Sequence, residues 1–499
     1  MSTPAMTTAL PATIATEMGW HFDNTYARLP DAFFARVLPA PVRAPGVVVV
    51  NHGLADAMGL RTRGVDDATL AAVFAGQVLP AGADPIAQAY AGHQFGGFTV
   101  LGDGRAILLG EQRTPDGRLL DVQFKGSGPT PYSRRGDGRA ALGPMLREYV
   151  ISEAMHALGI PTTRALAVVT TGEPVYRERV LRGAVLTRVA ASHVRVGTFE
   201  YFAAHRNVDG LRTLVAYVVD RHDPSLTGRE DAALALLDAV TTRQAALVAR
   251  WMGVGFVHGV MNTDNMAVSG ETIDYGPCAF LDRYHPDTVF SSIDQMGRYA
   301  YAQQPGIAQW NLARFAEALL PLLAPEREAA IDLAKGVVHD FPARFERAWM
   351  HEMRRKLGLA DARDTDGALV AGLLGWMEQE GADLTNTFRS LSADGDVSEG
   401  PSGASAARAA WSSDWAARVA AEGSTIAVAR ERMRAVNPVV IPRNHQVEAA
   451  LAGAERDDLA PLTALLASVQ RPFEDGPWHD GFREAGAEGD EPYRTFCGT

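Results

Sequence analysis

The chain has 499 residues, of which 47% are hydrophobic and 21% are charged, and its formal net charge is −12 at pH 7. This length exceeds one compact core and indicates two or three packed units of an ordinary globular protein. The negative charge argues against a nucleic-acid partner, although it leaves room for a local basic pocket that binds a small anion. With two cysteines and no apolar run of the roughly 18 residues that a membrane span needs, we expect a cytoplasmic monomer that does not bind membranes.

The residues before Ala91 suggest no chemistry. Residues 29–50 contain four prolines and are expected to be mostly extended, with a short turn around Phe33-Phe34. Two short amphipathic helices are expected over 54–60 and 66–74, and Asp66 is placed to cap the second.

A glycine-rich stretch begins at Ala91 and leads into a predicted antiparallel strand pair, 106–109 with 119–125. Gly102, Gly104 and Arg105 lie just before the first strand. Glycine N–H groups beside an arginine suit a phosphate, because no Cβ obstructs the approach of the oxygens. The pattern is neither a dinucleotide fingerprint nor a Walker A motif, and an ordinary glycine-rich turn remains an alternative.

Lys125 ends the second apolar strand, where a cation is costly unless it is paired or points to water. A helix is predicted over 145–158, and Glu148 lies on the flank of its apolar face. A strand Lys tied to a helix Glu is how kinase-like folds hold a phosphate-binding ammonium. The connecting loop, 126–139, is basic, glycine-rich and long for a connector, which makes a functional role a reasonable expectation.

Further strands are predicted over 165–170 and 184–189, followed by a helix over 230–252. Arg188 and Arg195 could form an anion clamp or simply lie on the solvated surface. His193, between them, is interpreted as a structural histidine rather than a ligand.

The segment 255–280 places Asp264 next to Asn265 and brings Asp274 before Tyr275-Gly276. Two carboxylates and an amide are the oxygen ligands that Mg²⁺ or Mn²⁺ prefers. Residues 266–273 are predicted to form two short strands around a Ser-Gly turn, a hairpin that would fold Asp274 back beside Asn265. A polar turn without function is the alternative, but Asp-Tyr-Gly is close to the Asp-Phe-Gly metal motif of protein kinases.

Beyond this segment we expect helices over about 307–358, a linker or insertion over 391–406, and further alanine-rich helix before a Gly/Asp-rich tail. No internal repeat is visible.

These pieces together resemble the selenoprotein O family, also called the YdiU family. The resemblance is dense over roughly residues 25–345 and sparse over the last 150. It is carried by long, specific blocks: YAGHQFGGF, LGDGRAILLGE, KGSGPTPYSRRGDGRA, REYVISEAMHALGIPTTRAL, SHVRVGTFE, HGVMNTDNM and IDYGP.

The resemblance implies an α+β, protein-kinase-like bilobal fold, with a sheet-rich N-lobe over a helical C-lobe. It divides the chain into an N-terminal extension (1–84), an N-lobe with nucleotide-binding loops (85–200), a C-lobe with the catalytic and metal site (201–345), and a C-terminal helical region and tail (346–499).

The resemblance also implies transfer of AMP from ATP, held in a flipped orientation, to Ser, Thr or Tyr hydroxyls of target proteins, with UMP from UTP as an alternative. Asp264 would accept the proton, Lys125 paired with Glu148 would organise the phosphates, and Asn265 with Asp274 would hold Mg²⁺ or Mn²⁺. The residues implied to contact the nucleotide are Gly102, Gly104, Arg105, Lys125, Asp137, Gly138, Arg188, Arg195 and Asp274.

The chain departs from the family pattern at two places. It ends Cys497-Gly498-Thr499, and 289–294 reads VFSSID where relatives often carry a cysteine. We therefore interpret Cys497 as an inert thiol rather than as half of a redox disulfide.

Two other functions stay open at this level. One is a kinase that uses the same cleft for γ-phosphoryl transfer, and the other is a nucleotide-binding scaffold without catalysis. Asp264 directly beside Asn265 departs from the usual kinase loop, where four residues separate base and metal ligand, and the retained polar groups disfavour a scaffold.

Overall fold

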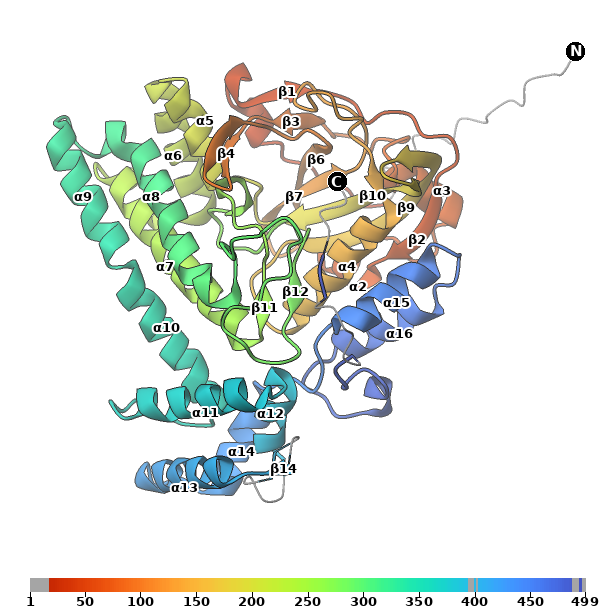
Figure 1. The fold of residues 1–499 in the computed structure, drawn as a ribbon. Helices are drawn as coiled ribbons and strands as arrows, with labels where there is room; N and C mark the ends of the chain where they lie inside the picture. Colours follow the sequence, from red (N-terminus) through yellow and green to blue (C-terminus); the bar gives the residue numbers. More distant parts are fainter. Residues whose placement is uncertain (1–17, 394–398, 401–402, 487–492, 496–499) are drawn as a thin grey trace, which may run out of the picture.

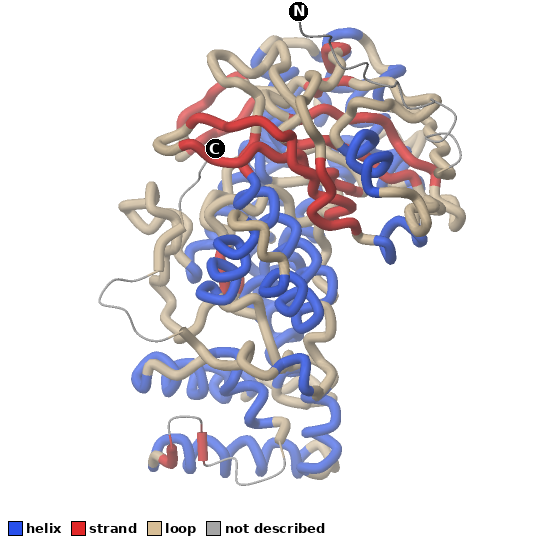
Figure 2. Tube along the Cα trace, turned by 90° about the vertical axis from the view of Figure 1, so that its right-hand side faces the viewer, coloured by secondary structure: helices blue, strands red, loops and turns tan. Residues whose placement is uncertain are grey.

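The structure is a computed structural model that describes residues 18–393, 399–400, 403–486 and 493–495. It is a mixed α+β fold in which an N-terminal antiparallel sheet region is followed by a largely helical C-terminal part (Figure 1). Figure 2 shows this division from the side, with most strands gathered above most of the helices.

Seven strands form the path of the main sheet in the order β1-β3-β6-β7-β10-β9-β2, and β8 pairs with β10 beside it. β1 and β2, which come from the first 84 residues, lie at the two edges of this path. The predicted N-terminal extension therefore contributes to the sheet. The strands are β1 (Phe34–Arg36), β2 (Gly46–Val50), β3 (Ile86–Gln88), β6 (Ala106–Arg113), β7 (Leu119–Lys125), β8 (Ala140–Ala141), β9 (Arg164–Tyr176) and β10 (Val180–Ala190).

The strands alternate between two apolar faces, as the two-residue period of a strand requires. Leu108 faces the core that contains α4 (Leu142–Ala157), whereas its neighbour Leu109 faces the core of α2 (His52–Ala57) and α3 (Asp67–Phe74). The sheet is thus covered by α4 on one face and by the two N-terminal helices on the other.

The local predictions in this part are confirmed. β6 and β7 pair antiparallel with Ala106 opposite Lys125, and the Asp66 carboxylate caps α3 by accepting from Thr69 N at 2.9 Å. The helix that carries Glu148 begins three residues earlier than predicted. The short strands β3 and β8 were not predicted, nor was a separate hairpin of β4 (Ala91–Gln94) and β5 (Gly97–Val100) within the glycine-rich stretch.

The helical part begins with five long helices and a short one. These are α5 (Val196–Ala204), α6 (Val208–His222), α7 (Ala232–Gly253), α8 (Gln304–Leu323), α9 (Arg327–His339) and α10 (Phe341–Lys356). Between α7 and α8 the chain forms an irregular segment with the small pair β11 (Phe256–Val257) and β12 (Ala279–Phe280).

By length and composition alone, α7 could cross a membrane, with a mean hydropathy of 1.3 over its most apolar window. The sequence predicted this helix, over 230–252, but no candidate membrane span within it. This is weak evidence for a membrane span, because residues such as Leu236, Val240 and Leu247 pack in the main core, as in the central helix of many proteins.

The first four C-terminal helices pack below α10, and the last two return to the sheet region (Figure 1). They are α11 (Asp366–Glu380), α12 (Leu384–Leu391), α13 (Ala406–Ala421), α14 (Ile426–Arg434), α15 (Asn444–Ala454) and α16 (Ala460–Val469), with a short pair, β13 (Glu399–Gly400) and β14 (Gly403–Ala404), before α13. α15 and α16 lie beside α4 (Figure 1), and Arg147 of α4 pairs with Glu448 of α15. Residues 394–398 and 401–402 of the predicted linker lie outside the described residues.

Candidate active site

A buried cluster of ion pairs joins the sheet to α4 and to the Asp-Tyr-Gly segment. Lys125 Nζ, at the end of β7, donates to Glu148 Oε2 at 2.6 Å and also pairs with Asp274 Oδ1. Arg188 of β10 donates to Glu148 Oε1 at 3.1 Å. The alternative of a water-facing Lys125 is therefore wrong, and the predicted Lys–Glu pair is confirmed.

Asp274 is held in a strained conformation as an anion. Its φ is +67°, a left-handed value that non-glycine residues adopt rarely and mostly where the surroundings enforce it. Burial alone would raise the pKa of this carboxyl, but Lys125, Arg188 and Arg105 hold the pKa well below its usual range. Asp274 therefore stays ionised at any physiological pH.

Asp264 has the opposite environment. It lies in a 3₁₀ turn, Thr263–Asn265, with its side chain buried, and its Oδ1 has no hydrogen-bond partner among the described residues. Arg195 donates to its backbone oxygen at 3.2 Å rather than to its carboxylate. Burial raises the pKa of Asp264 to about 6, although the charge of Arg195 opposes this. Such a carboxylate is suited to take up a proton near neutral pH.

The predicted hairpin over 266–273 is wrong in its pairing. A turn does form, with Gly270 N donating to Ala267 O at 3.1 Å, but the two arms do not pair with each other. Ala267 forms an antiparallel bridge with Arg195, and Thr272 forms a parallel bridge with Thr162. The arms bond to segments distant in the sequence, which satisfy their backbone groups equally well. Asn265 and Asp274 nevertheless line the same cavity.

The unpredicted β4–β5 hairpin packs directly on the Asp264 turn. A Cβ placed on Gly92 would come within 2.3 Å of Asp264 Oδ1. His93 N donates to Thr263 Oγ1 at 2.7 Å, and Glu200 of α5 bridges His93 Nδ1 and Thr263 Oγ1 at 2.5 Å each. The Gly-His dipeptide was part of the glycine-rich signal in the sequence, but nothing local indicated a partner about 170 residues away.

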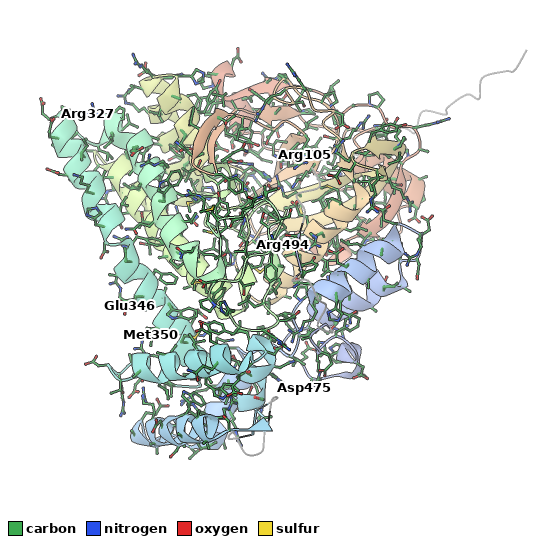
Figure 3. All side chains as sticks on the ribbon, viewed as in Figure 1. Arg105, Arg327, Glu346, Met350, Asp475 and Arg494 are labelled. Carbon is green, nitrogen blue, oxygen red and sulfur yellow. The ribbon has the colours of Figure 1, made fainter. Side chains whose placement is uncertain are left out.

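A cavity of about 600 Å³ connects these groups. Every residue predicted to contact nucleotide or metal lines it, and Glu148 lies behind Lys125. In Figure 3, Arg105 lies at the sheet end of this region. Eight cationic side chains line the cavity against four acidic ones, a local excess of positive charge in an acidic chain. The cations are Arg105, Lys125, Arg134, Arg135, Arg139, Arg177, Arg188 and Arg195, and the acids are Asp103, Asp137, Asp264 and Asp274.

The contacts of Asp137 differ from those of the other predicted ligands. Its carboxylate pairs with Arg177 at 2.9 Å and accepts from Arg139 N at 3.0 Å, so it orders the basic loop around itself. Gly138 has φ +64°, and a Cβ there would meet Gly128 O at 2.0 Å, which explains the glycine at this position.

The donor set at Asn265 and Asp274 fits a hard divalent cation. Asn265 Nδ2 donates to Val260 O at 3.0 Å, which leaves the amide oxygen as the ligand atom. Asp274 offers a carboxylate that remains ionised. No cluster of three or more His, Cys, Asp or Glu suited to a metal occurs among the described residues, so substrate oxygens would have to complete the coordination.

His193 and Cys278 are both buried. His193 is buried and its Nδ1 lies 3.0 Å from Asp121 Oδ2, in agreement with a structural role. Burial lowers the pKa of His193 to about 4 and raises the pKa of the free Cys278 thiol to about 12. Cys497 lies outside the described residues.

A cationic cavity built on a Lys–Glu–Asp cluster, with the buried Asp264 in its lining, has the chemistry to bind a phosphate-bearing ligand. Comparison with known proteins identifies the family. The model of the family described as "Protein adenylyltransferase SelO" matches residues 17–470. The chain belongs to this family.

Similar relatives extend over nearly the whole chain. A protein nucleotidyltransferase YdiU of Syntrophotalea carbinolica is 56% identical over 482 residues, covering 96% of this chain and 98% of its own length. A protein of the same name from Geobacillus kaustophilus is 56% identical over 97% of this chain and all of its own length. Another from Rhizobium etli is 56% identical over 96% of this chain and 97% of its own.

Proposed function

We propose that this chain transfers AMP from ATP to Ser, Thr or Tyr hydroxyls of other proteins. As a member of the SelO family it is a protein nucleotidyltransferase. The observation that carries the finer proposal is the single cavity, into which ten predicted ligand residues and the predicted base Asp264 converge from distant parts of the sequence. UMP transfer from UTP is the alternative within the same chemistry.

The proposed architecture is kinase-like and bilobal, with the sheet above the helical part and the nucleotide between them. Three observations support it. Lys125 lies at the end of a strand, Glu148 lies on the helix that covers the sheet, and Asp274 lies on the irregular segment between β11 and β12. The domain limits 1–84, 85–200, 201–345 and 346–499 remain part of this proposal.

In the proposed reaction the hydroxyl oxygen of the target attacks the α-phosphorus of ATP. The new oxygen–phosphorus bond replaces the bond to the β-phosphate, and pyrophosphate leaves. The hydroxyl proton goes to Asp264, whose Oδ1 is buried and has no hydrogen-bond partner in the described structure. Lys125, Arg105 and Arg188 bind the phosphate oxygens and stabilise charge that develops on them.

Asn265 and Asp274 are the residues that would hold Mg²⁺ or Mn²⁺. When bound, the cation would supply further neutralisation of the phosphate charge. Glu148 does not line the cavity, and its part is to hold Lys125 and Arg188 in position. Glu148 is therefore a positioning residue.

The test is an incubation of the chain and candidate protein substrates with Mn²⁺ or Mg²⁺ and ATP labelled with ³²P at either the α or the γ position. The proposal expects label on protein from α-labelled ATP only, and loss of that label to background in Asp274→Ala. Parallel incubation with α-labelled UTP decides between AMP and UMP.

Two results would contradict the proposal. Label from the γ position alone would assign the cavity to a kinase. Absence of label from either position, with ATP binding intact and a broad set of proteins offered, would favour the nucleotide-binding scaffold.

Glu200→Gln is expected to lower the transfer rate about tenfold without changing ATP affinity. The buried carboxylate of Glu200 accepts from both His93 and Thr263, and thereby fixes the turn that carries Asp264. An amide accepts at one end and donates at the other, so one of these two partners must change from donor to acceptor and its contact shifts, and small displacements of a base are costly. Single-turnover transfer and nucleotide titration would measure the two quantities.

Glu346→Gln is the matched control, because Glu346 is exposed on α10, well separated from Arg105 in Figure 3. Equal rates in Glu200→Gln and the wild type would show that the β4–β5 contact does not position the base.

A further inference from the structure

Exposed apolar side chains gather at the mouth of the cavity. Of the ten large apolar residues that are most exposed in the described structure, five lie in two short segments, 95–100 and 293–296. Phe95 and Ile293, which are 41% and 55% exposed, also line the cavity. We call the following set the apolar rim: Phe95, Phe98, Val100, Ile293, Met296 and Trp310.

Ring contacts connect three of the six rim residues, Phe98, Trp310 and Phe95, through His93, Arg298 and the buried Tyr299. Phe98 of β5 lies 5.3 Å from the His93 ring, and His93 lies 5.4 Å from Trp310 of α8. The Arg298 guanidinium stacks on Trp310 at 4.9 Å and lies 5.7 Å from the Tyr299 ring. Phe95 then meets Tyr299 edge-to-face at 5.2 Å. The surface therefore runs from the hairpin across α8 to the loop before it.

The rim is attached to the Asp264 turn at both ends. Phe95 N donates to Asn262 Oδ1 at 3.2 Å, and the Tyr299 hydroxyl donates to the same oxygen at 2.7 Å. Phe95 has φ +50°, a conformation unfavourable for an aromatic residue, and its side chain is not buried in return. A strained, exposed aromatic beside a catalytic turn is typical of a binding site rather than of a packing residue.

We propose that the apolar rim binds the segment of the protein substrate that carries the acceptor hydroxyl, and that it selects a large apolar side chain close to that hydroxyl. This inference rests on the proposed function, because it assigns a docking surface to the same reaction. The rim is continuous with the cavity through Phe95 and Ile293, so a segment lying on it delivers its hydroxyl toward Asp264.

Charge adds a second feature to the expected segment. Arg298 is stacked on Trp310 and makes no ion pair with a carboxylate among the described residues, and Arg314 stacks on the same ring at 5.0 Å. Arg314 is already paired with Glu317 at 2.6 Å. Arg298 is thus the available cation on the rim, and an Asp or Glu near the apolar residue of the substrate is its natural partner.

The experiment measures binding separately from transfer. The peptides share a central Thr. In each pool one flanking position is fixed to a single amino acid while the other flanking positions vary, and the pools are bound to beads. They are offered to the Asp264→Asn chain, which retains the rim but lacks the base. The expected result is enrichment of Leu, Ile, Met or Phe at one or two flanking positions and of Asp or Glu at another.

Three substitutions are then made in that chain. Phe98→Ser and Met296→Ser are each expected to reduce the apolar preference about fivefold to tenfold, as loss of an anchor at an interface does. Arg298→Gln is expected to remove the acidic preference and to keep the apolar one. Leu333→Ser, at a 41% exposed site on α9, is the control that should leave both preferences intact.

The same peptides, tested for transfer in the otherwise wild-type chain, should show an increased KM in Phe98→Ser and Met296→Ser with kcat and ATP affinity unchanged. No flanking preference, or a preference that persists in the rim variants, would overturn the inference even if AMP transfer occurs. A shift from dimer to monomer in those variants, measured by sedimentation, would assign the rim to a second copy of the chain instead. Selective peptide binding without any transfer would leave the rim in place and contradict the proposed reaction.

Discussion

Gly92→Ala is expected to lower nucleotide transfer about a hundredfold while leaving ATP affinity within about twofold. The added methyl group would lie 2.3 Å from Asp264 Oδ1 and 2.8 Å from its Cγ, so either the carboxylate or β4 must move. A displacement of this size at a general base costs about two orders of magnitude in rate. Transfer of label from α-³²P-ATP under single-turnover conditions, with ATP affinity from titration, measures both quantities.

Gly306→Ala is the matched control, because Gly306 lies in α8 and a Cβ there has no neighbour within 4 Å. Alanine is favoured over glycine inside a helix, so this variant should be at least as stable as the wild type and fully active. A Gly92→Ala chain with normal transfer would mean that the hairpin is loose around Asp264. A parallel loss of ATP binding would mean that the cavity itself had collapsed.

The parts of the site that could be predicted from sequence depend on short-range patterns. The β6–β7 pair follows from alternation around a Thr-Pro-Asp-Gly turn, and Lys125 and Glu148 are separated by 23 residues on elements whose apolar faces must meet. Residue chemistry also indicated some of the other cavity residues, because phosphate and metal sites need arginines, glycines and hard oxygen ligands, whereas Asp137 and Gly138 were implied only by the family resemblance.

The contacts that position Asp264 could not be predicted in this way. Gly92 touches Asp264 across 172 residues of sequence, and Glu200 joins His93 to Thr263 from a third element. The arms of the 266–273 turn had equally suitable partners in each other and in the distant segments at 162 and 195, and only the packed fold decides between them. No periodicity in a single sequence carries that information.

Asp264→Asn is expected to lower the transfer rate about a thousandfold. The same substitution is expected to make the chain more stable near pH 8. The loss follows because the amide cannot accept the hydroxyl proton, a contribution of about 10²–10⁴ for a general base. The gain follows because the wild-type carboxylate is buried with Oδ1 unpartnered among the described residues, whereas a neutral amide is cheaper to bury. Arg195 bonds to the backbone oxygen of residue 264, so the substitution leaves that contact in place.

The pH dependence of this gain distinguishes its cause. The pKa of Asp264 is raised from 3.8 to about 6 in the folded chain, so folding favours the protonated form. That stabilisation is complete below about pH 3.8 and is lost as the pH rises through 6, which leaves a cost of up to about 3 kcal/mol for the charged group at pH 8.

In chelator-treated protein, urea unfolding followed by circular dichroism should therefore give Asp264→Asn a higher midpoint than wild type at pH 8. The difference should shrink as the pH falls from 7 toward 5, and Asp332→Asn, at an exposed position on α9, should show no such trend. A difference that is the same at every pH would trace the gain to packing, and Asp264 would then not be the buried, titrating base on which the proposed mechanism depends.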